Sequence, residues 1–186
     1  MKRSIFAFAG ALSIMLSAAV PALAATSLDV PTVASAPSLD PHANSSFGKA
    51  GTATLAYTAS GGHADEAATV HVERDSSSLY VRFEVPQSEQ LVGAAGGDSV
   101  AIDVWPSGDT GDRYHLGVGL DGKHTGDSTA NTATWESAAA SSPGGYVVTM
   151  KIPLSALGSS TRVQFSRWLS STGELPSTTM LVGRCE

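Results

Sequence analysis

The residues best suited to bind a ligand are aromatic and polar side chains that stand out of phase with the apolar residues around them. In a segment that alternates with period two, apolar side chains point to one face of a strand and the intervening ones to the other. The intervening residues of three such segments include Asp103, Trp105, Arg113, His115, Gln164 and Trp168. If the three strands are neighbours in one sheet, we expect these residues to share one face. Flat indole rings beside fixed polar groups would then form a ligand-binding site.

Other roles for the tryptophans stay open. Trp105 and Trp168 lie at the ends of their segments, where a tryptophan can simply cover the edge of the fold. Trp135 has few apolar neighbours on its own face of the strand. We expect it to pack against the fold rather than to bind a ligand. Arg167 is in phase with apolar residues, so it should point inward or lie at the rim. A buried charge there must be paired, which favours a structural role.

Four acidic residues in glycine-rich loops are candidates for a structural calcium ion: Asp109, Asp112, Asp121 and Asp127. Carboxylate oxygens are typical calcium ligands. However, the spacing lacks the Asp-x-Asp-x-Asp-Gly pattern of an EF-hand, and acidic turns are often only hydrated. The histidines form no close pair, and the single cysteine, Cys185, stands next to the C-terminal residue. We therefore expect no cofactor and no zinc, with calcium as the alternative.

The sequence carries no motif of a catalytic machinery. A Gly-x-Ser-x-Gly elbow, a His-Glu-x-x-His motif and a P-loop are all absent from it. Two carboxylates placed across a cleft could still hydrolyse a glycosidic bond without any local motif. Because the acidic residues fall mostly in turns, we expect a binding protein and not an enzyme.

Period-two alternation recurs along the chain and predicts an all-β fold. The clearest alternating segments are 70–72, 79–85, 100–104, 114–120, 146–152 and 163–165. Clusters of glycine, serine and aspartate separate them and predict turns. A total of about nine strands favours an antiparallel β-sandwich of jelly-roll or immunoglobulin-like type. Little helix is expected, in short turns at 88–95 and 153–157.

The N-terminal segment has the organisation of a cleavable signal peptide. Lys2 and Arg3 precede an apolar run that is too short to span a membrane and that ends in small residues at Ala24. We expect cleavage near Ala24, export to the periplasm or the medium, and no membrane insertion of the mature form. Residues 25–50 are rich in alanine, serine and proline and should form an extended lead-in outside the core, followed by one domain at 51–186.

The charge of the expected mature chain limits its partners. Without residues 1–24 there are 9 basic and 17 acidic residues, a net charge of −8 with neutral histidines. So acidic a domain lacks the basic stripe that binds a phosphate backbone or anionic lipid headgroups. Nucleic acid is therefore not an expected partner.

Several segments follow one another in the order typical of a known family. They are 67–72, 79–85, 97–104, 113–118, Trp135, 146–157 and 163–168. In this order the sequence resembles the family 9 carbohydrate-binding module-like domain, a β-sandwich related to the DOMON fold. Two positions depart from the family pattern: Phe47 stands in place of an early tryptophan, and Trp105 in place of a small or acidic residue.

The resemblance implies a secreted, non-catalytic protein that binds a glycan through exposed aromatic residues on a sheet face. Sugar rings have apolar faces, which can stack on an indole, and hydroxyl groups at their rims, which can bond to polar side chains. The ligand-binding residues that we expect are therefore Asp103, Trp105, Arg113, His115, Gln164 and Trp168. Two alternatives stay open. DOMON sandwiches can hold a b-type haem, for which Met150 and His115 are candidates, although alternation points them to opposite sides. A sandwich can also dock to another protein of the cell envelope.

Overall fold

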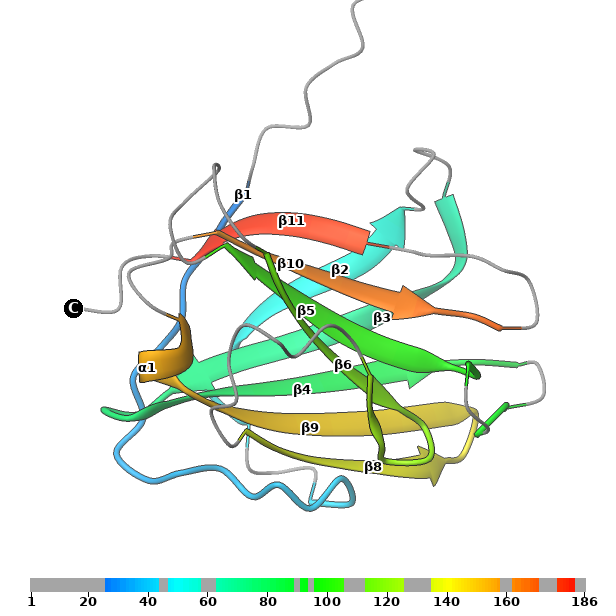
Figure 1. Cartoon of the computed structure of the whole chain (residues 1–186), viewed down its shortest axis with the longest axis horizontal. Helices are drawn as coiled ribbons and strands as arrows, with labels where there is room; N and C mark the ends of the chain where they lie inside the picture. Colours follow the sequence, from blue (N-terminus) through cyan, green and yellow to red (C-terminus); the bar gives the residue numbers. More distant parts are fainter. Residues whose placement is uncertain are drawn as a thin grey trace, which may run out of the picture.

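The computed structural model describes residues 26–43, 47–57, 63–88, 91–93, 96–105, 113–125, 135–157, 162–170 and 177–182. The expected signal peptide, Cys185 and the candidates Asp109, Asp112 and Asp127 lie outside these residues. The described chain forms two β-sheets packed face to face, with one short helix, α1 (Leu154–Leu157) (Figure 1). No helix in these ranges is long and apolar enough to cross a membrane.

The two sheets have six and five strands. The six-stranded sheet has the order β1 (Thr26–Leu28), β11 (Ser177–Val182), β10 (Arg162–Trp168), β5 (Ser99–Trp105), β6 (Tyr114–Gly119) and β7 (His124–Thr125). The five-stranded sheet has the order β2 (Gly51–Tyr57), β3 (His63–Arg74), β4 (Ser78–Pro86), β9 (Gly145–Pro153) and β8 (Glu136–Ser142). Neighbouring strands are antiparallel, except that β1 runs parallel to β11.

The core lies between the sheets and consists of the apolar residues that alternate along each strand. Its buried members on the central strands include Val81, Phe83, Val100, Ile102, Val104, Val148, Met150, Ile152, Val163 and Phe165. Phe83 and Phe165 meet edge to face across the two sheets, with 6.1 Å between ring centroids. Burying one such side chain contributes about 1.5–3 kcal/mol. The predicted antiparallel β-sandwich is confirmed, as is the short helix within 153–157.

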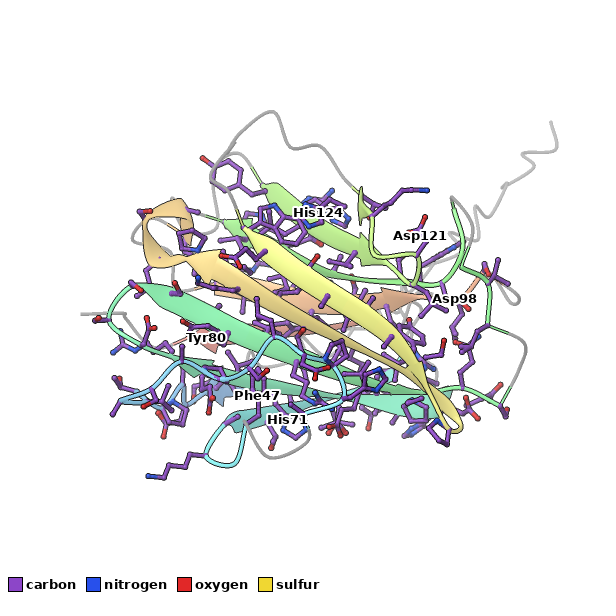
Figure 2. All side chains as sticks on the ribbon, turned by 90° about the horizontal axis from the view of Figure 1, so that it is seen from below. Phe47, His71, Tyr80, Asp98, Asp121 and His124 are labelled. Atoms are coloured by element: carbon purple, nitrogen blue, oxygen red, sulfur yellow. The ribbon has the colours of Figure 1, made fainter. Side chains whose placement is uncertain are left out.

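Residues 31–43 cross the outer face of the five-stranded sheet (Figure 2). The main-chain nitrogen of Val33 donates to the carbonyl of Arg74 at 2.7 Å. Nearer the centre of the sheet, Nη1 of Arg82 donates to the carbonyl of Pro41 at 3.1 Å. The segment has bends at 34–35 and a turn at 41–42, and it crosses one outer face of the sandwich.

The expectation that residues 25–50 stay outside the core was wrong at two positions. Leu28, in β1, belongs to the hydrophobic core, and Phe47 is buried. Proline excludes helix and disfavours central strands, but it does not prevent neighbouring apolar residues from packing. Phe47, which stands in place of an early tryptophan of the family pattern, is thus a packed residue.

Arg167 is 1% exposed and joins the two sheets at one end of the sandwich. It belongs to β10 of the six-stranded sheet. Its Nη1 donates to the carbonyl of Pro86, at the end of β4, at 3.1 Å, and its Nη2 donates to the carbonyl of Glu66 in β3. The inward, partnered placement expected for this residue is confirmed.

We expect Arg167→Ala to lower the free energy of unfolding by about 2–4 kcal/mol, because the carbonyls of Pro86 and Glu66 lose their donor and the buried side chain leaves a cavity. Denaturation followed by tryptophan fluorescence measures this. Lys49→Ala, at an exposed position, is the control and should change the free energy by less than about 0.5 kcal/mol. Equal effects of the two substitutions would contradict a structural role for Arg167.

Asp75 closes the turn between β3 and β4. Its carboxylate accepts hydrogen bonds from the main-chain nitrogens of Ser77 at 2.7 Å and Ser78 at 2.8 Å. It also accepts one from the hydroxyl of Tyr80 at 2.7 Å. These donors, the Ser77 amide above all, lower the pKa of Asp75 from 3.8 to about 2.

Because the folded state lowers this pKa, ionised Asp75 stabilises the fold above about pH 4, and that contribution is lost as the pH falls towards about 2. The difference in free energy of unfolding between the unmodified protein and Asp75→Ala should therefore be constant above pH 4 and shrink below it. Urea denaturation over a pH series measures the difference. A difference independent of pH would exclude the carboxylate charge as its source.

Candidate functional site

β5 lies between β10 and β6, so the three strands that carry the candidate residues are neighbours. Trp105 of β5 is opposite Arg162 of β10. Asp103 is opposite Gln164 on one side and His115 on the other. Because paired residues point to the same face, these side chains lie on the outer face of the six-stranded sheet, away from the core. That face carries the candidates Asp103, Trp105, Arg113, His115, Gln164 and Trp168.

A charged cluster occupies the centre of this face. The Asp103 side chain is 7% exposed, and its Oδ1 lies 2.7 Å from Nδ1 of His115. The same oxygen lies 3.5 Å from Nε of Arg113, whose side chain is 52% exposed. Burial of a carboxylate is costly unless hydrogen-bonding and cationic partners compensate for the lost water. Asp103 therefore anchors two side chains that reach the solvent.

Gly117 leaves room for this cluster. A Cβ atom at this position would lie 2.3 Å from Oγ1 of Thr125 and 3.1 Å from Nε2 of His115. Any larger residue would displace the imidazole or push β7 away from β6. The absence of a side chain at Gly117 is thus part of how His115 is positioned.

Trp105 is held by a cation–π contact. The guanidinium of Arg162 lies 4.5 Å from the centroid of the indole ring, which leaves the ring partly exposed. Arg162 was not among the residues expected to bind a ligand, although the alternation that selects Gln164 and Trp168 selects it as well. Its position against Trp105 follows from strand pairing, which alternation alone does not reveal.

Trp168 lies at the opposite end of the same face. It pairs with Ser99, whereas Trp105 pairs with Arg162, so six residues of strand separate the two indoles. At about 3.3 Å per residue this is about 20 Å. Trp168 is 37% exposed. The two tryptophans therefore share a face but cannot stack on the two sides of one small ring.

Asp121 is the calcium candidate that the structure describes. Its Oδ2 lies 3.0 Å from Nζ of Lys123, and its Oδ1 accepts a hydrogen bond from the main-chain nitrogen of Lys123 at 3.1 Å. These two contacts lower the pKa of Asp121. Within the described ranges, no three His, Cys, Asp or Glu side chains are grouped to hold a metal ion. Asp121 thus forms an ion pair with the lysine of its own turn.

Trp135 packs, as expected. Its ring stacks on His124 with 3.6 Å between centroids and 9° between planes, and it also contacts the core. Burial lowers the pKa of His124, and its Nε2 lies 2.9 Å from Oγ of Ser137. This stack joins β7, at the edge of one sheet, to the start of β8 in the other.

The structure does not bring together Met150 and His115, the two candidate haem ligands. Met150 is fully buried on the inner face of β9, in the five-stranded sheet. His115 lies on the outer face of the six-stranded sheet, bonded to Asp103. With a whole sheet between them, the two side chains cannot ligate one iron.

Comparison with known proteins identifies the fold. No protein-family model and no curated protein matches the sequence. Among solved structures, a family 9 carbohydrate-binding module of Caldicellulosiruptor kristjanssonii in complex with glucose has a TM-score of 0.63 and 17% identity, over 85% of this chain and 96% of that one. A family 9 module of the same organism in complex with cellotriose has a TM-score of 0.61 and 20% identity, over 82% and 83% of the two chains. The chain therefore has the fold of the family 9 carbohydrate-binding modules.

Proposed function

We propose that the outer face of β10, β5 and β6 binds carbohydrate without catalysis, in a protein that acts outside the cytoplasm. The observation that carries this proposal is the partly exposed indole of Trp105, held by Arg162, beside the cluster of Asp103, His115 and Arg113. A pyranose ring can stack an apolar C–H face on an indole while its hydroxyls bond to neighbouring charged groups.

Two further arguments support carbohydrate as the ligand. Both solved structures named above are binding modules in complex with a sugar, glucose in one and cellotriose in the other. The opposite outer face of the sandwich is crossed by residues 31–43, whereas the exposed Trp168 lies on the proposed face. Gln164, next to Asp103, adds an amide that can both donate and accept hydrogen bonds.

The number and the position of the carboxylates on this face support binding without catalysis. Glycoside hydrolysis normally uses two carboxylates that flank the scissile bond. Within β10, β5 and β6, Asp103 is the only carboxylate, and it is buried and paired with His115 and Arg113. A group in this position can orient its neighbours but is poorly placed to transfer a proton to a ligand.

We expect the protein to bind at least one member of a broad glycan panel in calorimetry or affinity electrophoresis. Trp105→Ala should weaken that binding about tenfold or more, and Arg113→Ala several-fold, because a stacking surface or a hydrogen-bond donor is lost. Tyr57→Ala removes a 46% exposed aromatic residue from β2, outside this face, and is the matched control.

Absence of binding to every glycan, with the fold intact by circular dichroism, would refute the proposal. A pull-down from the secreted fraction tests the alternative of a protein partner. If a protein is captured with this chain and excess sugar does not release it, the face is a protein-docking surface.

Export has its own test. We expect the protein recovered outside the cytoplasm to have the mass of a chain that begins at Ala25, because cleavage follows Ala24. Deletion of residues 2–20 should keep the protein inside the cell. Recovery of the full-length chain with its N-terminus intact would contradict cleavage.

A further inference from the structure

We infer that the Trp105 end of this face selects acidic sugars, in which the ring carries a carboxylate or another anionic group. The inference rests on the proposed carbohydrate binding and adds the class of ligand to it. Its basis is a row in which an indole stands between two arginines: Arg162 of β10, Trp105 of β5, and Arg113, which directly precedes β6.

The strand register puts the two arginines on opposite sides of the indole. Trp105 is opposite Arg162 in the pairing of β5 with β10. In the pairing of β5 with β6, Val104 is opposite Tyr114, so the next position brings Arg113 beside Trp105. Neighbouring strands are about 5 Å apart. Both arginines are therefore anchored within reach of a single sugar ring that contacts the indole.

The charge that this end presents to solvent is positive. The Arg113 side chain is 52% exposed, and Arg162 is half-buried over the Trp105 ring. Asp103, in contrast, is buried, and it is the only acidic residue in the described strands of the six-stranded sheet. The carboxylate lies beneath its partners, so the charged groups that a ligand meets first are cationic.

This end differs in sign from the rest of the molecule. The whole sequence has 17 acidic and 11 basic residues. On the outer face of the five-stranded sheet the carboxylates are the open groups, with the Glu84 side chain 47% exposed and the Glu136 side chain 60% exposed. A local positive field on an acidic protein concentrates anions at one place. A neutral sugar gains nothing from this field, whereas a sugar acid does.

Arg113 is oriented by Asp103 without being tightly bound to it. Its Nε lies 3.5 Å from Oδ1 of Asp103, which is longer than a normal hydrogen bond. The short contact of that oxygen, 2.7 Å, is with Nδ1 of His115. With the described part of the chain, the Arg113 guanidinium forms no closer polar contact. Its forked N–H groups therefore remain available for a two-point contact with a ligand carboxylate.

Two matched pairs of sugars test this inference: glucuronate with glucose, and galacturonate with galactose. In each pair a carboxylate replaces the terminal hydroxymethyl group, and the ring is otherwise the same. We expect the acid of at least one pair to bind about tenfold or more tightly than its neutral partner in calorimetry, because it gains charge-assisted hydrogen bonds. Raising the salt from about 0.01 M to about 1 M should reduce this preference by screening. Galactose 6-sulfate against galactose shows whether a sulfate ester is accepted as well.

Variants assign the preference to the arginines. Arg113→Gln should remove most of it, and Arg162→Gln should reduce it. Arg113→Lys keeps the charge but loses the fork, so it should retain part of the preference. Lys49→Gln removes an exposed cation before β2, in the other sheet, and is the matched control that should preserve it. The measure is the ratio of the two affinities within each variant, which a general loss of folded protein does not change.

The results separate this inference from the function on which it rests. Equal affinities within both pairs for the unmodified protein, or a preference that Arg113→Gln and Arg162→Gln leave unchanged, would overturn the selection of acidic sugars and leave carbohydrate binding in place. The same holds if neutral glycans bind and neither acid does. Failure of both acids and of the whole glycan panel to bind would overturn carbohydrate binding itself.

Discussion

The burial of one face of β5 determines what the other face can do. Val100, Ile102 and Val104 are held in the core, and a shift of register by one residue would turn all three to solvent. At about 1.5–3 kcal/mol for each side chain, such a shift is excluded. Because β5 is paired on both sides, this restraint extends to β10 and β6. The placement of Trp105 and Asp103 on a common outer face follows from a core in which neither takes part.

Alternation in the sequence predicted the sandwich and the face on which each candidate residue lies. It says nothing of which strands pair, since many orders of the same strands bury the same apolar residues. The contact of Arg162 with Trp105 and the long separation of Trp105 from Trp168 therefore emerged only with the register. For Met150 and His115, alternation in the sequence was sufficient. It already pointed the two side chains to opposite sides, which argued against their binding the same haem iron.

The elements that sequence missed carry little alternating hydrophobicity. β8 has only alanine and serine after Glu136, so its strand character comes from pairing with β9 and not from its own side chains. The course of segment 31–43 over the sheet also depends on distant partners. The carbonyl of Pro31 accepts a hydrogen bond from the main-chain nitrogen of Arg74, and that of Pro41 accepts one from the Arg82 side chain. Such contacts are set by tertiary structure and leave no local pattern. Phe47 and Leu28 were the apolar residues that could have indicated packing in this region.

The stack of His124 on Trp135 and the bonds of Arg167 join the two sheets at separate places, which makes the sandwich a stiff support. Side chains that stand on its strands, and that are already tied to neighbours, have few torsions left to lose when a ligand arrives. Since each immobilised side chain otherwise costs about 0.5–1.5 kcal/mol, a preorganised face keeps more of its contact energy as affinity. For the carbohydrate binding proposed above, association should then proceed without rearrangement of the backbone, and differences between ligands should lie mainly in the dissociation rate.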